Sequence, residues 1–129
     1  MNKEESISDI VAYWMVKAKE SLEAAEDELK ANRVAFSVNR IYYACFYTVS
    51  AVLLQKGVKF KKHSGVRAAF HKYFVKTGLV SHDNGRFYDE LFEARQRGDY
   101  IELVSFEKEQ ADEWLRYAKV FVHEVSLLK

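Results

Sequence analysis

The distribution of helix-breaking residues is the feature that most restricts the fold of this sequence. The chain of 129 residues contains no proline, and its five glycines stand at positions 57, 65, 78, 85 and 98. The first 56 residues and the last 31 therefore hold no residue that readily interrupts a helix. We expect long helices at both ends of the chain and shorter helices between the glycines.

Apolar residues recur at helical spacing in five segments, and no segment combines period-two alternation with the turn dipeptides of a hairpin. Residues 34–54 are apolar or aromatic almost all round, so this helix should be central. The other predicted helices run from Ser6 or Ser8 to about residue 30, from Ser64 to Gly78, over 84–97 and from about Ser105 onward, with Asn32 as the cap of the second helix. The predicted fold is all-α, an up-and-down helical bundle of about five helices forming one domain over residues 1–129.

The composition excludes several classes of protein. Apolar residues make up 49% of the chain, too many for a disordered segment, and no apolar run is long enough to span a bilayer or follows a basic leader. We therefore expect a cytoplasmic protein with no membrane partner. The single cysteine, Cys45, lies in the most apolar segment and is expected to be a buried small hydrophobe.

Motifs for metals and cofactors are also missing. The four histidines form neither HxH nor HExxH, and the chain has no GxSxG, P-loop or GxGxxG sequence. We expect no metal site and no cofactor.

Charge is strongly segregated along the chain although the net charge is only +1. Residues 1–31 carry four basic and eight acidic side chains, residues 79–129 carry seven and eleven, and residues 32–78 carry nine basic side chains and no acidic one. A basic stretch with interleaved tyrosines suits a phosphate-bearing ligand, because lysine and arginine neutralise phosphates and aromatic rings stack on bases. The alternative is that the acidic helices pack beside the basic segment and cancel its field.

The densest basic cluster directly precedes a predicted helix start, where free backbone N–H groups attract anions. It forms either a phosphate site or a solvated loop. The candidate phosphate-binding residues of this strip are Lys59, Lys61, Lys62, His63 and Ser64.

Two arginines lie on predicted core-side positions, where an unpaired charge is costly. Arg40 has no acidic residue within one turn, so its partner must come from another helix, another subunit or a ligand. Arg95 shares a face with Tyr88 and Leu91 and either pairs with Asp99 or is presented to a phosphate. Both arginines are candidates for a common phosphate-binding groove.

Four short motifs of the chain, in their order and spacing, resemble the HEPN domains of prokaryotes, and within them the small stand-alone proteins. These motifs are Arg40-Ile41-Tyr42-Tyr43-Ala44 with Phe46, Lys62-His63-Ser64-Gly65-Val66 with Phe70, Phe74-Val75-Lys76-Thr77-Gly78-Leu79, and Leu91-Phe92-Glu93-Ala94-Arg95-Gln96-Arg97-Gly98-Asp99-Tyr100. The resemblance implies a helical bundle, often a homodimer, that is associated with nucleotide or RNA ligands and with a nucleotidyltransferase partner protein.

Many members of that family are metal-independent ribonucleases with an arginine followed, after four to six residues, by a histidine. The resemblance implies that the arginine steadies the scissile phosphate and the histidine transfers a proton. Arg95 matches the arginine, but Asp99 and Tyr100 stand where the histidine should follow. Aspartate is a poor proton donor near pH 7 and tyrosine a poor base. Arg116 and His123 fit the bare spacing but lie mid-helix, and we interpret Arg116 as a partner of Asp112 or Glu113.

Three functions therefore remain open from the sequence. The favoured one is a homodimeric module, non-catalytic or weakly catalytic, that binds nucleotide or RNA phosphates through Arg40, Arg95 and the strip from Lys59 to His63. The second is a toxin-antitoxin type endoribonuclease in which Arg95 acts with Asp99, Tyr100 or a histidine from elsewhere. The third is a protein partner of a nucleotidyltransferase.

Overall fold

The computed structural model describes residues 3–58, 60, 62–98 and 106–128. Within these residues the chain is helical and contains no strand, so the predicted all-α fold is confirmed. The elements are α1 (Lys3–Lys30), α2 (Val34–Gln55), α3 (His63–Phe70), the π-helical turn η1 (His71–Val75), α4 (His82–Gly98) and α5 (Lys108–Ser126).

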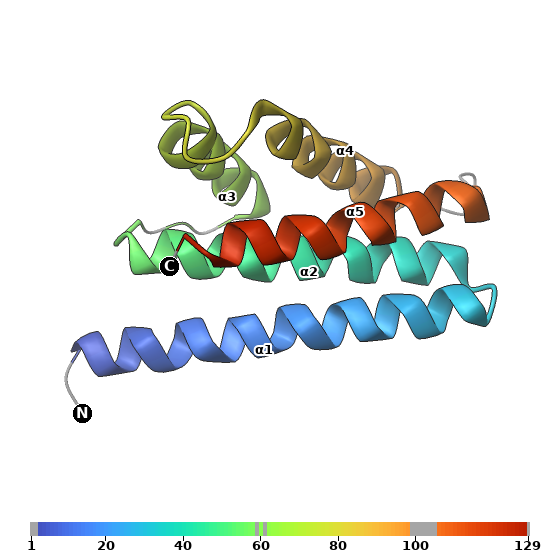
Figure 1. Cartoon of the computed structure of the whole chain (residues 1–129), viewed down its shortest axis with the longest axis horizontal. Coiled ribbons are helices and arrows are strands. Elements are labelled where there is room, and N and C mark those ends of the chain that lie inside the picture. The colour runs from blue at the N-terminus through green and yellow to red at the C-terminus, as the bar shows by residue number, and fades with distance from the viewer. Residues whose placement is uncertain (1–2, 59, 61, 99–105, 129) are drawn as a thin grey trace.

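The helices form a bundle with α2 at its centre. α1, α2 and α5 run lengthwise beside one another, and α3 and α4 pack across one side of this group (Figure 1). α2 contacts α1, α3, α4 and α5, as its almost uniformly apolar sequence predicts. This central position lets α2 meet both of the short helices that carry the candidate site.

The turn between α1 and α2 differs from the sequence prediction. Asn32 adopts a left-handed backbone with φ of 61°. Its N–H donates to the carbonyl of Leu29 at 3.0 Å, and the N–H of Arg33 donates to that of Glu28 at 2.9 Å. This pair of bonds is a helix C-terminal motif. Asn32 therefore ends α1, and the prediction that it caps α2 was wrong, because the N-cap position is taken by Arg33, whose side chain makes no capping bond.

Helix starts also move from their predicted positions. α1 begins before Ser6 and Ser8, at Lys3, and the predicted start at Ser105 lies outside the described residues. The predicted cap Ser64 was wrong, because α3 begins at His63 with the extended residue Lys62 before it. An N-cap residue itself has a non-helical backbone, and here that residue is Lys62, two positions before Ser64.

The third predicted helix does not continue as an α-helix to Gly78. It widens at η1, where the Lys76 N–H donates to the His71 carbonyl at 2.8 Å. The wider turn brings both Phe74 and Val75 into the core beside α4. α4 approaches this turn so closely that a Cβ at Gly85 would lie 3.1 Å from side-chain atoms of His71 and Val75.

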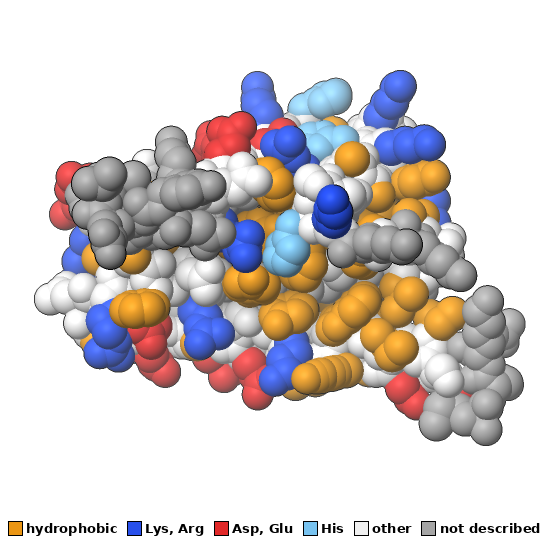
Figure 2. All heavy atoms as spheres, turned by 180° about the vertical axis from the view of Figure 1, so that it is seen from behind, with side chains coloured by type: hydrophobic (Ala, Val, Ile, Leu, Met, Phe, Trp, Pro, Cys, Tyr) orange, Lys and Arg blue, Asp and Glu red, His pale blue; other side chains and the backbone are white. Residues whose placement is uncertain are grey.

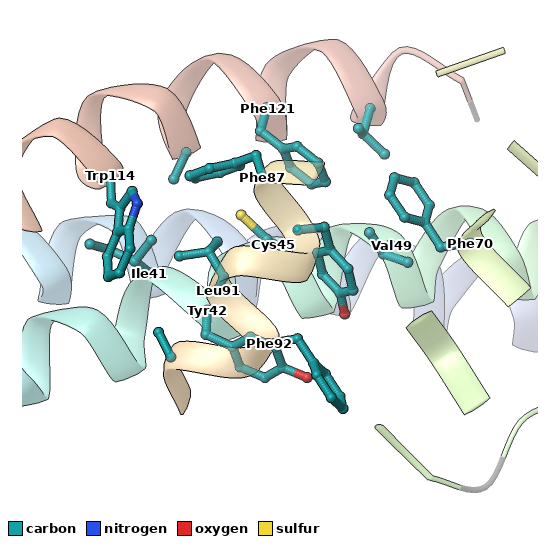
Figure 3. Packing of buried hydrophobic residues seen from close by; sticks show 14 of the residues in the cluster. Ile41, Tyr42, Cys45, Val49, Phe70, Phe87, Leu91, Phe92, Trp114 and Phe121 are labelled. Carbon is teal, nitrogen blue, oxygen red and sulfur yellow. The ribbon is translucent and has the colours of Figure 1, made fainter. Parts of the chain in front are cut away.

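The core is built around the inner faces of α2, α4 and α5. Cys45, Val49, Tyr88, Leu91 and Phe121 are almost completely buried, which confirms the buried position predicted for Cys45. Figure 3 shows aromatic rings on two sides of α4. Phe87 and Phe121 lie toward α5, whereas Tyr42 and Phe92 lie on the opposite side of α4. Tyr42, in this second group, is part of the candidate functional site.

Candidate phosphate-binding site

Arg95, in the last turn of α4, is held by two tyrosines of α2. Its guanidinium carbon lies 5.4 Å from the ring centres of both Tyr42 and Tyr43, and its Nη2 donates to the Tyr43 hydroxyl at 3.1 Å. The side chain is half-buried. Contacts with aromatic faces and a hydroxyl restrict the orientation of the guanidinium. Arg95 is therefore a cation whose direction is set by the protein.

His63, the first residue of α3, is held by the same tyrosine pair. Its Nδ1 lies 2.8 Å from the Tyr42 hydroxyl, and its ring centre lies 5.8 Å from that of Tyr42 and 5.9 Å from that of Tyr43. The ring also stacks on Phe46 at 4.2 Å with an angle of 8° between the planes. These contacts fix both the position and the plane of the imidazole. Arg95 and His63 thus come from different helices and meet at Tyr42 and Tyr43.

Burial keeps the tyrosine beneath the site in its neutral form. Desolvation raises the pKa of Tyr42 to about 12, and this outweighs the opposite effects of Tyr88 and Arg95. Burial likewise raises the pKa of Tyr88 well above its ordinary value. At neutral pH the Tyr42 hydroxyl therefore carries its proton and contacts His63 as a neutral group. The positive charge of Arg95 is not neutralised by tyrosinate.

The site adjoins a partly apolar surface. Tyr43, Phe46 and Tyr47 of α2 are half-buried, and Phe36 on the same helix is 64% exposed. The face turned away from the viewer in Figure 1 shows a band of hydrophobic side chains with a histidine and several lysines and arginines among them (Figure 2). Aromatic rings interleaved with basic side chains are typical of surfaces that bind single-stranded nucleic acid.

The structure brings together only part of the predicted phosphate-binding set. His63 and Arg95 contact the same pair of tyrosines, whereas Lys62 and Ser64 are exposed beside His63. Arg40 is exposed on α2, so its predicted position on the core side was wrong. The cause is that α2, although apolar over most of its length, presents one side to solvent at Phe36 and Arg40.

Several predicted site residues cannot be placed. Lys59, Lys61, Asp99 and Tyr100 lie outside the described residues, and with them the predicted pairing of Arg95 with Asp99. Arg116 lies 3.6 Å from Asp112 on the surface of α5, which confirms the structural role expected for it.

Three site residues were missed as participants by the sequence prediction. Tyr42, Tyr43 and Phe46 were recognised as apolar helix residues and as part of a motif, but not as the groups that join Arg95 to His63. A signal was present, since Tyr42 and Tyr43 stand four and three residues before Phe46, and residues at these spacings are neighbours on a helix surface. The sequence could not show that α3 and α4 converge on that side, because the contacts of Tyr42 with His63 and of Tyr43 with Arg95 span 21 and 52 residues.

Neither a metal-binding cluster nor a membrane-spanning helix occurs among the described residues. No group of three or more His, Cys, Asp or Glu side chains in this part of the chain is arranged to hold a metal ion. Over the same residues, no helix is both long enough and apolar enough to cross a membrane.

Comparison with known families places the fold and the site in context. Residues 11–128 match the family model described as HEPN domain, which covers most of the chain and all of the described site. The chain belongs to the HEPN domain family. The membership implied by the four short motifs is thereby confirmed. In this HEPN protein Arg95 of α4 bonds to Tyr43, and His63 of α3, which precedes it in the sequence, lies within hydrogen-bond distance of the neighbouring Tyr42.

The curated relatives of this HEPN protein include proteins with and without a functional name. A protein of Thermotoga maritima named "UPF0332 protein" is 50% identical over 128 residues, which cover 99% of this chain and 95% of the relative. Two proteins of Methanocaldococcus jannaschii are also similar. "Putative toxin MJ0142" is 38% identical over 83% of this chain and 73% of its own length, and "Putative toxin MJ0605" is 33% identical over 81% and 82%.

Proposed function

We propose that this chain is a toxin-type HEPN protein that binds RNA and cleaves it without a metal ion, with Arg95 and His63 acting on one phosphate. The observation that carries the proposal is the placement of these two side chains against the same tyrosine pair, Tyr42 and Tyr43. The similarity to two proteins named as toxins supports the toxin-type assignment.

Arg95 is suited to hold the phosphate. A guanidinium presents several N–H donors in a fixed plane and keeps its charge at any physiological pH. The contact with the Tyr43 hydroxyl orients the side chain before a ligand arrives, so that less conformational entropy is lost on binding. As negative charge builds up on the phosphate oxygens, a fixed cation at this position stabilises the transition state.

His63 is suited to transfer the proton. Imidazole exchanges protons near neutral pH; in the tautomer that the proposed reaction requires, Nδ1–H donates to the Tyr42 oxygen and Nε2 is the nitrogen that takes up a proton. In the proposed reaction Nε2 takes the proton of the ribose 2′-hydroxyl, and the 2′-oxygen attacks the phosphorus. The bond to the 5′-oxygen breaks, this oxygen takes a proton from water, and the hydroxide that is left takes the proton from Nε2, which restores His63. The products are a 2′,3′-cyclic phosphate and a 5′-hydroxyl. His63 would thus supply the role that the family motif assigns to the missing histidine.

The test is cleavage of a labelled RNA of mixed sequence by the purified protein in the presence of a chelator. We expect His63→Asn and Arg95→Ala each to slow cleavage by about 100-fold or more, because general acid–base catalysis contributes at least that factor. Asparagine at position 63 can still bond to Tyr42, so that the fold should be kept. Arg116→Ala, which removes an exposed arginine from α5, should cleave like the wild type.

Each failure of the test has a distinct meaning. Cleavage that survives both substitutions in folded protein would contradict the assignment of this site. RNA binding without any cleavage by the wild type would reject catalysis and leave the module that binds RNA phosphates. No binding at all would reject the proposed function.

A further inference from the structure

A second arginine stands one helical turn along α3 from His63. Arg67 follows His63 by four residues, so the two side chains share a face of the helix. The Arg67 guanidinium carbon lies 4.3 Å from the ring centre of Phe92 on α4, and its side chain is 36% exposed. Phe92 in turn packs against Tyr42, with 6.4 Å between the ring centres. Arg67 is therefore fixed next to the proposed site while part of it faces solvent.

The nearest carboxylate does not hold Arg67 by a hydrogen bond. Asp89 Oδ1 lies 2.9 Å from His71 Nε2 but 3.9 Å from Arg67 Nη1. His71 therefore holds the carboxylate, and Arg67 feels it only as a nearby charge. A partly exposed ion pair at this distance contributes little and is readily exchanged for a stronger anionic partner.

We infer that Arg67 binds the phosphate next to the one held by Arg95 and His63, so that a single RNA strand runs along the α3–α4 side of the bundle. This inference rests on the proposed function. Side chains four residues apart on a helix stand about 5–6 Å from each other at Cβ, which is comparable to the spacing of neighbouring phosphates along a strand. The Arg67 guanidinium lies over the Phe92 ring, and its N–H groups can donate to a phosphate oxygen.

The inference predicts that binding depends on the number of phosphates in the ligand. The probes are a dinucleotide with one phosphate and two trinucleotides that extend it by one nucleotide on the 5′ or the 3′ side. All carry 2′-deoxyribose at the scissile position, so that none can be cleaved. For the wild type we expect one of the two trinucleotides to bind about tenfold more tightly than the dinucleotide, the gain of a charge-assisted contact.

Substitutions separate this subsite from the main site. Arg67→Ala should remove the gain shown by the trinucleotide and leave dinucleotide binding unchanged. Asp89→Asn, which keeps a polar partner for His71, should strengthen binding of the same trinucleotide several-fold. Arg116→Ala is the matched control, because it also removes an arginine beside an aspartate, at 3.6 Å, but on α5. It should bind both probes like the wild type.

The outcomes are distinguishable. If Arg67→Ala keeps its fold by circular dichroism and keeps the full gain of the trinucleotide, the inference is wrong while the proposed function stands. If neither trinucleotide binds better than the dinucleotide to the wild type, the inference is also wrong. If the wild type binds none of the probes, the proposed function fails and the subsite with it.

Discussion

Replacement of Tyr42 by phenylalanine tests how the buried tyrosine supports the site. The hydroxyl lies 2.8 Å from His63 Nδ1, and the side chain is fully buried. Without it, a half-buried imidazole nitrogen loses a hydrogen-bond partner at a place where water enters poorly. Loss of one partner in such a pair costs about 1–3 kcal/mol. We expect Tyr42→Phe to lower the free energy of unfolding at pH 7 by an amount in this range.

The same substitution should change the response to alkali. Because burial raises the pKa of Tyr42 to about 12, the unfolded chain, whose tyrosine ionises near pH 10, loses its proton first. The contribution of Tyr42 to the free energy of unfolding is therefore fully present below pH 10 and is lost as the pH rises from about 10 to 12. One pKa unit corresponds to about 1.4 kcal/mol, so that Tyr42 accounts for a loss of roughly 3 kcal/mol. Tyr42→Phe should lack this part of the loss.

The assay is urea unfolding followed by circular dichroism at pH 7, 10 and 12 for the wild type, Tyr42→Phe and Tyr43→Phe. Tyr43→Phe is the control, because it removes the neighbouring hydroxyl, which accepts a hydrogen bond from Arg95 and belongs to a ring that is only half-buried. Tyr88, whose pKa is raised chiefly by its own burial, remains in both variants, so that the larger part of any alkaline loss due to it is common to all three proteins. If Tyr42→Phe loses as much stability between pH 10 and 12 as the wild type, the reasoning about its burial is refuted.

Three further predictions concern packing and assembly. Gly85→Ala should lower the free energy of unfolding, measured in urea, by about 1 kcal/mol, because the added Cβ would lie 3.1 Å from side-chain atoms of His71 and Val75. Gly65→Ala is the control and should not lower it, because the nearest atom to its added Cβ lies at 3.9 Å. Equal stabilities of the two variants would contradict the packing of η1 on α4. Burial raises the pKa of the Cys45 thiol, so this thiol should react with a thiol reagent at pH 7 only as fast as the protein unfolds. Rapid labelling of the folded protein would contradict its buried position. Phe36 is a large apolar side chain that is 64% exposed, so we expect the protein to form a homodimer at micromolar concentration in light scattering. Phe36→Glu should weaken this dimer. A monomeric wild type would refute the prediction.

The fold could be predicted from local patterns because the segments are regular. The absence of proline, the spacing of apolar residues and the apolar second segment were sufficient to predict an all-α bundle with α2 at its centre. Helix ends were harder, since Asn32 is a plausible cap for α2 and an equally plausible left-handed end for α1. Only the packing of α2 against α1 selects the second role.

The site could be predicted only in part because it depends on contacts between distant segments. Arg95 and His63 were both identified, one from a helix stripe and one from a basic strip. The sequence assigned His63 to the strip with Lys62, whereas the structure turns its ring onto Phe46 and Tyr42. Nothing local to His63 distinguishes a solvated loop histidine from one stacked on an aromatic helix. The role of Tyr42 could not be predicted for the same reason.

The most direct test of a shared site is a double-mutant cycle for RNA binding. The affinity of a short RNA with 2′-deoxyribose at the scissile position is measured for the wild type, His63→Ala, Arg95→Ala and the double variant, with circular dichroism as a check of folding. If both side chains act on one phosphate, the double variant should lose less binding free energy than the two single losses together, by about 0.5–3 kcal/mol. Strictly additive losses would contradict a common site for Arg95 and His63.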